Sequence, residues 1–204
     1  MTWSKRILDV TLALVLVLTL APLAFVIALW ILFSSGRPVF YLSERMKGVD
    51  QPFLLWKFRT MATAGVDSGV SGGDKAVRIT REGRLLRRLR LDEIPQLWNI
   101  LRGDMSFVGP RPPLRLYVER FPDLYARVLQ SRPGITGLAT LHFHRHEERI
   151  LATCHTAEET DAAYSRRCVP RKARLDLIYQ RSCSTCGDIV ILVKTLLRVF
   201  RPDR

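Results

Sequence analysis

The chain has 204 residues, a length that suits one domain with an added membrane element and is short for two full domains. Lys and Arg number 32 against 19 Asp and Glu, and the formal net charge of +13 calls for an anionic partner such as nucleic acid, lipid headgroups or a phosphorylated substrate. The four cysteines exclude a disulfide-rich secreted mini-protein, and the lone CxxC at residues 183–186 is weak evidence for zinc or redox chemistry, so we expect reduced thiols.

An apolar run occupies residues 12–33, where no residue is charged and Thr19 is the one polar side chain. As an α-helix rising about 1.5 Å per residue, the run would cover about 30 Å of hydrocarbon. Three interpretations compete: a cleaved signal peptide, a simple spanning helix, and a helix broken at Pro22 that re-enters the same leaflet. The apolar core of a signal peptide is about 7 to 15 residues long, whereas this run continues well past Pro22.

The charges that flank the run favour the re-entrant interpretation. Lys5 and Arg6 precede the run, and further basic residues follow it. Basic flanks prefer the cytoplasmic side of a membrane. A spanning helix would place one flank outside, whereas a hairpin bent at Pro22 keeps both inside. We therefore expect a re-entrant helix-break-helix membrane hairpin in residues 1–36 and a cytosolic domain at the membrane surface in residues 37–204.

The remaining elements are predicted from apolar spacing and from turn residues. The expected fold class is α/β, mostly helical with a small sheet and with interfacial amphipathic helices. The C-terminal apolar helix suits either the membrane interface or a buried core. In chain order the sequence predicts strands over residues 38–41 and 53–58, a glycine-rich loop over 62–75, a basic helix over 78–91, a helix that begins near Pro95, a helix over 114–128 broken at Pro122, and a helix over 189–200.

Asp92 and Glu93 are adjacent carboxylates, expected at the start of the helix that begins near Pro95 because proline is tolerated in a first helical turn. The positive end of the helix dipole and the arginines just before the pair would favour the ionised form of both groups. A nucleophile or a metal ligand needs that form. The alternative is simple capping of the helix by Asp92.

Three other segments could bind phosphate. Residues 57–61 (KFRTM) would place Lys57 and Arg59 on one face of a strand, which suits a diphosphate, although a solvated edge strand is the alternative. Arg111 lies between two prolines, and its guanidinium could bind phosphate through two parallel hydrogen bonds or lie in a solvated turn. Residues 132–137 (RPGITG) hold two glycines that permit close backbone approach to a ligand, or form only a turn.

Three of the four histidines, His142, His144 and His146, alternate along the chain. On a strand they would share one face, which is a conceivable metal geometry. The neighbouring charged residues favour a polar exposed segment instead.

These segments, in this order, resemble the bacterial sugar transferase family, the monotopic phosphoglycosyl transferases. The resemblance covers nearly the whole chain, from residues 5–9 (KRILD) to the C-terminal helix. Its specific parts are residues 57–61 (KFRTM), 91–99 (LDEIPQLWN), 103–112 (GDMSFVGPRP) and 132–137 (RPGITG).

The resemblance implies transfer of a sugar-1-phosphate from a UDP-sugar to polyprenol (undecaprenyl) phosphate with release of UMP, as the first membrane step of bacterial glycoconjugate or polysaccharide synthesis. By that resemblance Asp92 is the nucleophile of a covalent aspartyl-phosphosugar intermediate, and Glu93 is its metal-site partner or a general base. Mg²⁺ is implied, bound by Asp92 and the diphosphate. Arg111, Lys57 and Arg59 are implied to hold phosphates.

The resemblance also implies a monotopic enzyme at the cytoplasmic face of the bacterial inner membrane, in contact with phospholipid and not with nucleic acid, and it leaves a homodimer open. Two segments depart from the family pattern. Ala21 stands where the family often has serine before the hairpin proline, and residues 138–144 (LATLHFH) replace a Gln-Val stretch and a Gly-Arg pair. The second departure leaves the donor sugar open.

Two other function classes compete with the enzyme. The charge of +13 suggests a membrane-anchored nucleic-acid-binding protein, but the chain lacks an aromatic-basic RNA-binding motif and a recognisable helix-turn-helix. A non-catalytic scaffold of a glycan assembly complex is the other class. The presence of Asp92, Glu93 and Arg111 argues against it.

Overall fold

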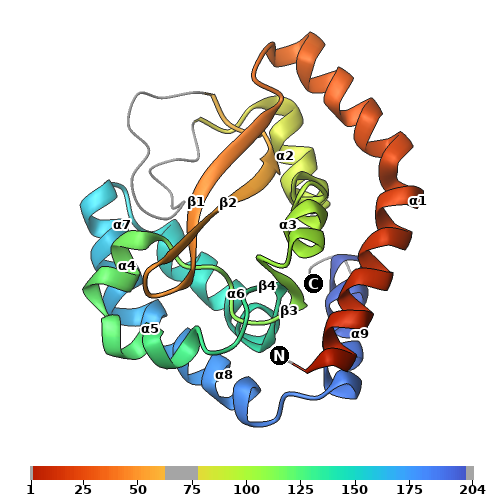
Figure 1. Ribbon diagram of the computed structural model, residues 1–204. Helices are drawn as coiled ribbons and strands as arrows, with labels where there is room; N and C mark the ends of the chain where they lie inside the picture. Colours follow the sequence, from red (N-terminus) through yellow and green to blue (C-terminus); the bar gives the residue numbers. More distant parts are fainter. Residues whose placement is uncertain (1, 63–77, 201–204) are drawn as a thin grey trace.

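A computed structural model describes residues 2–62 and 78–200, and it is mostly helical with two small sheets (Figure 1). The predicted loop over residues 62–75 lies outside the described residues, except for Ala62. The elements in chain order are α1 (Trp3–Ser35), β1 (Phe40–Gly48), β2 (Gln51–Phe58), α2 (Arg81–Arg88), the 3-10 helix η2 (Leu91–Glu93), α3 (Gln96–Arg102), β3 (Ser106–Val108), α4 (Arg115–Arg120), α5 (Pro122–Val128), β4 (Gly134–Thr136), α6 (Leu138–Ala152), α7 (Ala157–Ala163), the π-helix η3 (Tyr164–Cys168), α8 (Val169–Arg181) and α9 (Thr185–Phe200).

Each sheet has two strands. β1 and β2 form an antiparallel hairpin in which Phe40 pairs with Phe58, and β1 is longer than the strand predicted over residues 38–41. β3 and β4 pair in parallel, with Ser106 opposite Gly134. The sequence did not predict the second sheet, because its strands are three residues long and come from segments about thirty residues apart in the chain.

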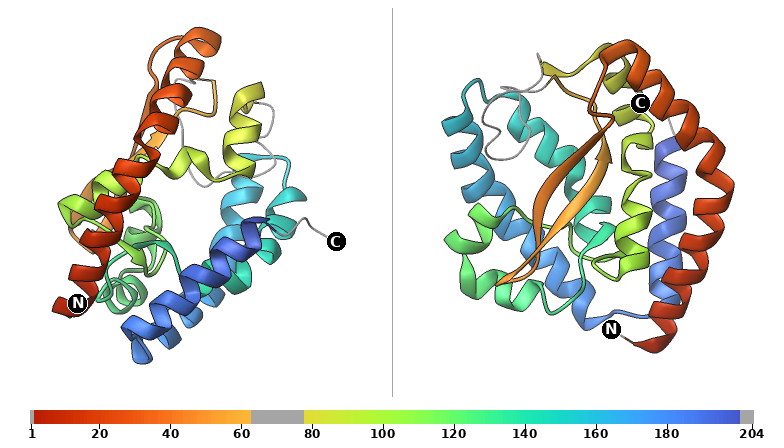
Figure 2. Two further views of the ribbon diagram at one scale, coloured as in Figure 1. Left: turned by 90° about the vertical axis from the view of Figure 1, so that its right-hand side faces the viewer. Right: turned by 45° about the horizontal axis from the view of Figure 1, so that its top comes forward.

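α1 is one continuous helix of 33 residues with Pro22 inside it, so the predicted interruption at Pro22 is wrong. The helix instead curves along one side of the molecule (Figures 1 and 2). Proline removes one helical hydrogen bond and bends a helix without necessarily ending it. By length and composition, α1 is the one helix in the described part of the chain that could cross a membrane, and 11% of its apolar window is buried in the protein.

The N-terminal end of α1 is held by a buried polar network around Lys5. The Lys5 ammonium group donates to the Val108 carbonyl at 3.0 Å and to the Tyr179 hydroxyl at 2.9 Å, and it forms an ion pair with Asp188. The Tyr179 hydroxyl donates to Asp188 at 2.7 Å. These contacts join α1 to α8, to α9 and to the end of β3.

We expect Lys5→Met to lower the free energy of unfolding by about 3–5 kcal/mol, because Asp188 would stay buried without its cation. Thermal unfolding in detergent micelles measures the change. The double variant Lys5→Met/Asp188→Asn should recover part of the loss. Arg102→Gln is a suitable control, because the Arg102 side chain is 59% exposed. A wild-type unfolding temperature for Lys5→Met would show that the network does not hold the helix.

The C-terminal end of α1 is held by Arg59, the residue that follows β2. Its guanidinium donates to three consecutive carbonyl groups, those of residues 35–37, at distances of 2.6, 2.7 and 3.0 Å. The last carbonyl groups of a helix have no later amide to accept from, so Arg59 supplies the missing donors. Ile31 is buried just before this end. Both ends of α1 therefore contact the same folded body.

Large exposed apolar side chains gather on α1 and α9. α9 packs beside the N-terminal part of α1, where Ala13 and Ile191 share a buried cluster (Figure 1). α9 therefore has one face in the core, as one of the two predicted locations required, and an exposed apolar face, for which the membrane interface stays a prediction. An exposed apolar surface of this kind marks a protein or membrane contact. The large apolar side chains that are at least half exposed are Trp3, Ile7, Val15, Leu18, Phe25, Val26 and Phe33 of α1 and Val190, Val193, Leu196 and Leu197 of α9.

Candidate active site

Asp92 and Glu93 lie together in η2, directly before α3. Arg90, which precedes this turn, has a φ of 59° in the left-handed region, and this backbone reversal separates α2 from η2. Pro95 is the N-cap residue of α3, so the alternative that Asp92 caps this helix is wrong. The two carboxylates are 6% and 7% exposed. The pair therefore lies at the predicted place in the chain, but it is buried.

Three cations converge on one oxygen of Glu93. Its Oε1 accepts from Arg111 Nη2 at 2.9 Å, from Lys57 Nζ at 3.3 Å and from Arg90 Nη1 at 3.5 Å. Burial acts to raise the pKa of Glu93, but the charges of Arg111, Lys57 and Arg90 hold this pKa well below its usual range. Glu93 is therefore ionised and serves to hold the three cations in place.

Asp92 is in a different environment from its neighbour. Burial raises the pKa of Asp92 above its ordinary value; the charge of Lys57 opposes this rise and that of Glu93 adds to it. Its Oδ1 is buried and has no hydrogen-bond partner among the described residues. The predicted effect of the local cations holds for both groups, since the charges of Lys57, Arg87 and Arg90 lower the pKa of Asp92 as well. At Glu93 the cations outweigh burial, whereas at Asp92 burial outweighs the cations, so the expected preference for the ionised form is confirmed for Glu93 alone. Asp92 keeps an acceptor oxygen available for a ligand.

A cavity of about 630 Å³ opens in front of the pair. Arg45 was not predicted as part of this site. Arg45 and Lys47 are basic residues two positions apart on β1, and no signal in the sequence distinguishes them. Lys47 does not line the cavity and instead pairs with Asp104 at 2.6 Å. Burial and the nearby charge of Arg111 lower the pKa of Arg45 to about 10, so it is still cationic at neutral pH. The cations lining the cavity are Arg45, Lys57, Arg87, Arg88, Arg90, Arg111 and Lys172.

The predicted phosphate-binding residues divide between two places. Lys57 and Arg111 join Asp92 and Glu93 at the cavity. Arg59 is not among the described residues that line it, because β2 ends at Phe58 and the Arg59 side chain turns to the end of α1. Two positions of the KFRTM motif that are separated by one residue thus contact the cavity and the end of α1 separately.

Arg111 is positioned by a close crossing of the segment after β3 with β4. The Gly109 amide donates to the Thr136 carbonyl at 2.9 Å, and the Gly134 amide donates to the Pro110 carbonyl at 2.8 Å. A Cβ atom on Gly134 would lie 2.2 Å from the Gly109 nitrogen. The glycine that was predicted to approach a ligand therefore approaches another backbone segment, and this contact holds the loop that carries Arg111.

We expect Gly134→Ala to destabilise the protein by about 3 kcal/mol or more, because neither backbone can move aside without breaking the β3–β4 pair. Thermal unfolding of the purified chain in detergent measures the effect. Gly187→Ala is the matched control, since its added Cβ would meet only the Ser184 side-chain oxygen, at 3.0 Å. Equal unfolding temperatures for the two variants would contradict the tight crossing.

The three histidines do not form the metal geometry considered from the sequence. They lie on α6, and on a helix residues two apart point about 200° apart. His144 Nε2 lies 2.7 Å from Arg90 Nη2, and burial, with the charge of Arg90, lowers the pKa of His144 to about 4. Neutral His144 therefore accepts from Arg90 and holds it beside Glu93. Within the described ranges, no group of three or more His, Cys, Asp or Glu side chains could hold a metal ion.

A second, apolar groove of about 580 Å³ lies between α1 and the site elements. Ile94 and Pro95 line this groove, whereas Asp92 and Glu93, the residues directly before them, line the polar cavity. A polar site and an apolar groove therefore meet at the junction of η2 and α3. The other groove residues are Val17, Leu20, Ala21, Ala24, Phe25, Ala28, Phe40, Trp56, Phe58, Leu97, Trp98 and Leu101.

Comparison with known proteins finds sugar transferases in each case. The family model described as "Bacterial sugar transferase" matches residues 1–202. The chain is 36% identical to "Undecaprenyl-phosphate glucose phosphotransferase" of Komagataeibacter xylinus, over 96% of this chain and 35% of that protein. It is also 36% identical to "UDP-N-acetylgalactosamine-undecaprenyl-phosphate N-acetylgalactosaminephosphotransferase" of Aeromonas hydrophila, over 96% of this chain and 43% of that protein. "Uncharacterized sugar transferase EpsL" of Bacillus subtilis (strain 168) is 42% identical, over 68% of each chain. The chain thus spans less than half the length of the first two relatives.

Proposed function

Because the chain belongs to the bacterial sugar transferase family, we propose that it transfers a sugar-1-phosphate from a UDP-sugar to undecaprenyl phosphate and releases UMP. The observation that carries the proposal is the environment of the carboxylate pair. Glu93 gathers three cations in front of a cavity, and Asp92 presents an unpartnered oxygen beside them. This arrangement suits an anionic nucleophile that must approach an anionic diphosphate. Two relatives carry undecaprenyl phosphate in their names, which supports the acceptor.

The proposed reaction has two steps at phosphorus. Asp92 attacks the sugar-linked phosphorus, so that an Asp92 oxygen–phosphorus bond forms while the bond to UMP breaks. A phosphate oxygen of undecaprenyl phosphate then attacks the same phosphorus, takes the sugar-phosphate and frees Asp92. Lys57, Arg90 and Arg111 neutralise charge on the phosphates in both steps. Neither attacking group needs to lose a proton to a base, provided that Asp92 is ionised when the donor is bound.

Glu93 fits the role of a positioning residue better than that of a general base. Its pKa lies well below the usual range, so it has little tendency to take a proton. Its Oε1 is also shared among three cations. We infer that Glu93 holds Lys57, Arg90 and Arg111 at the spacing that the diphosphate requires.

Mg²⁺ is part of the proposal. Mg²⁺ sites often use one or two carboxylates together with substrate phosphates and water, and the unpartnered Asp92 Oδ1 fits such a ligand set. When bound, Mg²⁺ would neutralise diphosphate charge and favour the ionised form of Asp92. The cations around Glu93 leave Asp92 as the carboxylate of the pair with a free oxygen.

The contacts of α1 support a proposal for the membrane arrangement. A helix that spans a bilayer has its ends on opposite sides, whereas both ends of α1 contact one folded body. We propose that residues 1–36 enter the cytoplasmic leaflet of the inner membrane and return, with residues 37–204 as the catalytic domain at its surface. Exposed side chains such as Leu18 and Phe25 would contact phospholipid. The groove beside Ile94 offers the isoprenoid chain an apolar path to the polar site.

The test is a UMP-release screen of the full chain in detergent or nanodiscs, with undecaprenyl phosphate, Mg²⁺ and a panel of UDP-sugars. We expect release with at least one donor, dependence on the acceptor for multiple turnovers, and loss of release with a chelator. Salt-dependent DNA binding without UMP release from any donor would instead favour the nucleic-acid-binding class.

Cysteine labelling at residues 4 and 34 tests the topology, and both positions should react from the cytoplasmic side.

A further inference from the structure

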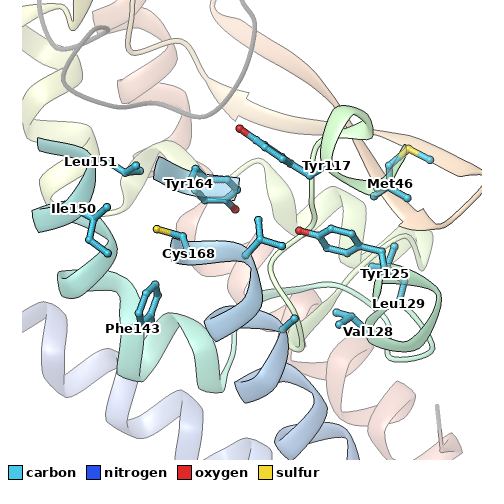
Figure 3. Close-up of a cluster of buried hydrophobic side chains, with 13 residues drawn as sticks. Met46, Tyr117, Tyr125, Val128, Leu129, Phe143, Ile150, Leu151, Tyr164 and Cys168 are labelled. Carbon is cyan, nitrogen blue, oxygen red and sulfur yellow. The ribbon is translucent and has the colours of Figure 1, made fainter. Parts of the chain in front are cut away.

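The site cavity extends from Asp92 into the largest hydrophobic core of the protein. One wall of its far end belongs to this core, which Figure 3 shows in close-up. This end therefore has a largely apolar wall, unlike the cationic end beside Glu93. The residues shared by the core cluster and the cavity wall are Tyr125, Val128, Leu151, Tyr164, Val169 and Ala173.

Asp176 of α8 is an anomaly in this apolar wall. It lines the cavity and is 7% exposed, and its Oδ1 is buried without a hydrogen-bond partner among the described residues. The charge of Lys172, one turn earlier on α8, lowers the pKa of Asp176, but the Lys172 ammonium group donates its hydrogen bonds to Glu147 at 3.0 Å and to the Tyr164 hydroxyl at 3.2 Å. A buried acceptor without a donor costs free energy, and native proteins seldom keep one without a reason.

The groups around Asp176 form a setting for a small polar ligand. Tyr125 is 8% exposed, and burial, with Tyr164 and Asp176 close by, raises its pKa. Figure 3 shows the hydroxyl groups of Tyr125 and Tyr164 pointing toward one another across this end of the cavity. A mostly apolar wall with a few convergent polar groups is typical of a small-molecule subsite. Burial raises the pKa of Asp176 itself to about 7, which agrees with a carboxylate that lacks donors.

The proposed reaction indicates which half of the donor reaches this subsite. In phosphoryl transfer the attacking and leaving oxygens lie roughly in line, on opposite sides of the phosphorus. UMP therefore departs away from Asp92. α2, next to η2, and α8, which carries Asp176, lie toward opposite ends of the molecule (Figures 1 and 2). Asp92 and Asp176 line the same cavity from different elements, so a nucleotide that departs away from Asp92 can extend toward Asp176, and a cavity of about 630 Å³ is within the size range of sites for such ligands.

We propose that Asp176 is a specificity-determining residue that accepts a hydrogen bond from the uridine half of the donor, from a ribose hydroxyl or from the uracil imide N–H. Both groups are hydrogen-bond donors, and carboxylates bind ribose hydroxyls in other nucleotide sites. The inference rests on the proposed function, because it takes the donor to be a UDP-sugar. Tyr125 completes the subsite as a flat apolar surface with a polar tip.

The test is calorimetric binding of UDP, which lacks the sugar, to the full chain at pH 8 with Mg²⁺. Asp176→Leu removes the acceptor, and we expect the Kd for UDP to rise about tenfold or more. The unfolding temperature of this variant should equal or exceed that of the wild type, since an unpaired buried charge is lost. A purely structural role would instead lower the unfolding temperature and leave UDP binding intact. Asp123→Asn, an exposed change on α5, should alter neither quantity.

Nucleotide analogues identify the contacted group. Among 2′-deoxy-UDP, 3′-deoxy-UDP and N3-methyl-UDP, the analogue that lacks the contacted donor should bind the wild type less tightly than UDP does. Asp176→Leu should not discriminate against that analogue. If Asp176→Leu fails to fold, Asp176→Asn in the same titrations decides, with a loss of affinity in the same direction expected.

Two results would overturn the inference. Unchanged UDP affinity in the Asp176 variants would show that the nucleotide does not reach Asp176. A rise in KM for the UDP-sugar with unchanged UDP affinity would assign Asp176 to the sugar instead. Failure of the proposed function is distinguishable from both, because it would appear as wild-type protein that releases no UMP from any UDP-sugar.

Discussion

Asp92→Asn is expected to reduce UMP release by about 10⁴-fold or more, because the amide cannot form the covalent bond to phosphorus on which both steps depend. The fold should be retained. Asparagine has the same shape, and burial already disfavours the charged form of Asp92. We therefore expect an unfolding temperature equal to or above that of the wild type, together with unchanged association with vesicles.

The measurement for Asp92 is single-turnover UMP release, combined with mass spectrometry of the peptide that contains residues 91–99 after incubation with donor alone. The wild type should carry a phospho-sugar on Asp92, and the variant should carry none. Asp50→Asn, in the exposed turn between β1 and β2, is the control for the loss of one carboxylate. A phospho-sugar trapped on a different side chain would refute the role of Asp92.

Arg111→Lys is expected to lower kcat/KM by about 10²–10³-fold, although the positive charge is kept. The guanidinium of Arg111 lies 2.9 Å from Glu93 and has further N–H groups available for a phosphate oxygen. A lysine ammonium is a single point of charge on a flexible stem, so it is poorly suited to bridge the two acceptors with fixed geometry. The loss should appear in kcat as well as KM if the contact strengthens as charge moves in the transition state.

The control for Arg111 is Arg115→Lys, which alters a surface ion pair with Glu44 at 2.7 Å and should leave kcat/KM near the wild-type value. Steady-state kinetics with the best donor from the UDP-sugar screen provides the comparison. Arg111→Lys with kcat/KM within about twofold of the wild type would mean that only the charge of Arg111 matters. The Gly109–Gly134 crossing, which holds the loop of Arg111, would then not be needed for catalysis.

Several local features were predictable because short-range chemistry decides them. The helix over residues 114–128 ends and restarts at Pro122, which begins α5 as an N-terminal proline can. The carboxylate pair precedes a helix because Pro95 is tolerated only near a helix start. The apolar run over residues 12–33 predicted one long apolar element, which α1 confirms, and the ordered motifs predicted the family, which the family match over residues 1–202 confirms.

Other predictions failed where the outcome depended on segments far apart in the chain. Arg59 was grouped with Lys57 by alternation, but the end of α1 supplies carbonyl groups that attract it. The histidines were considered as a strand, although their segment forms the helix α6. The glycines of residues 132–137 left a ligand contact and a simple turn open, but at Gly134 the Gly109 backbone occupies the space that a ligand would need.

The sequence by itself determined the family, the long apolar N-terminal segment and the carboxylates and cations available for chemistry, since these follow from residue types and their local spacing. Only the tertiary structure decided the environment of each carboxylate in that set. Glu93 binds the cations, whereas Asp92 and Asp176 each have a buried oxygen without a hydrogen-bond partner among the described residues. The physical reason is that solvation and charge act through space. The pKa of a carboxyl group depends on its burial and on which cations reach it, and the cations at Glu93 come from positions 57, 90 and 111.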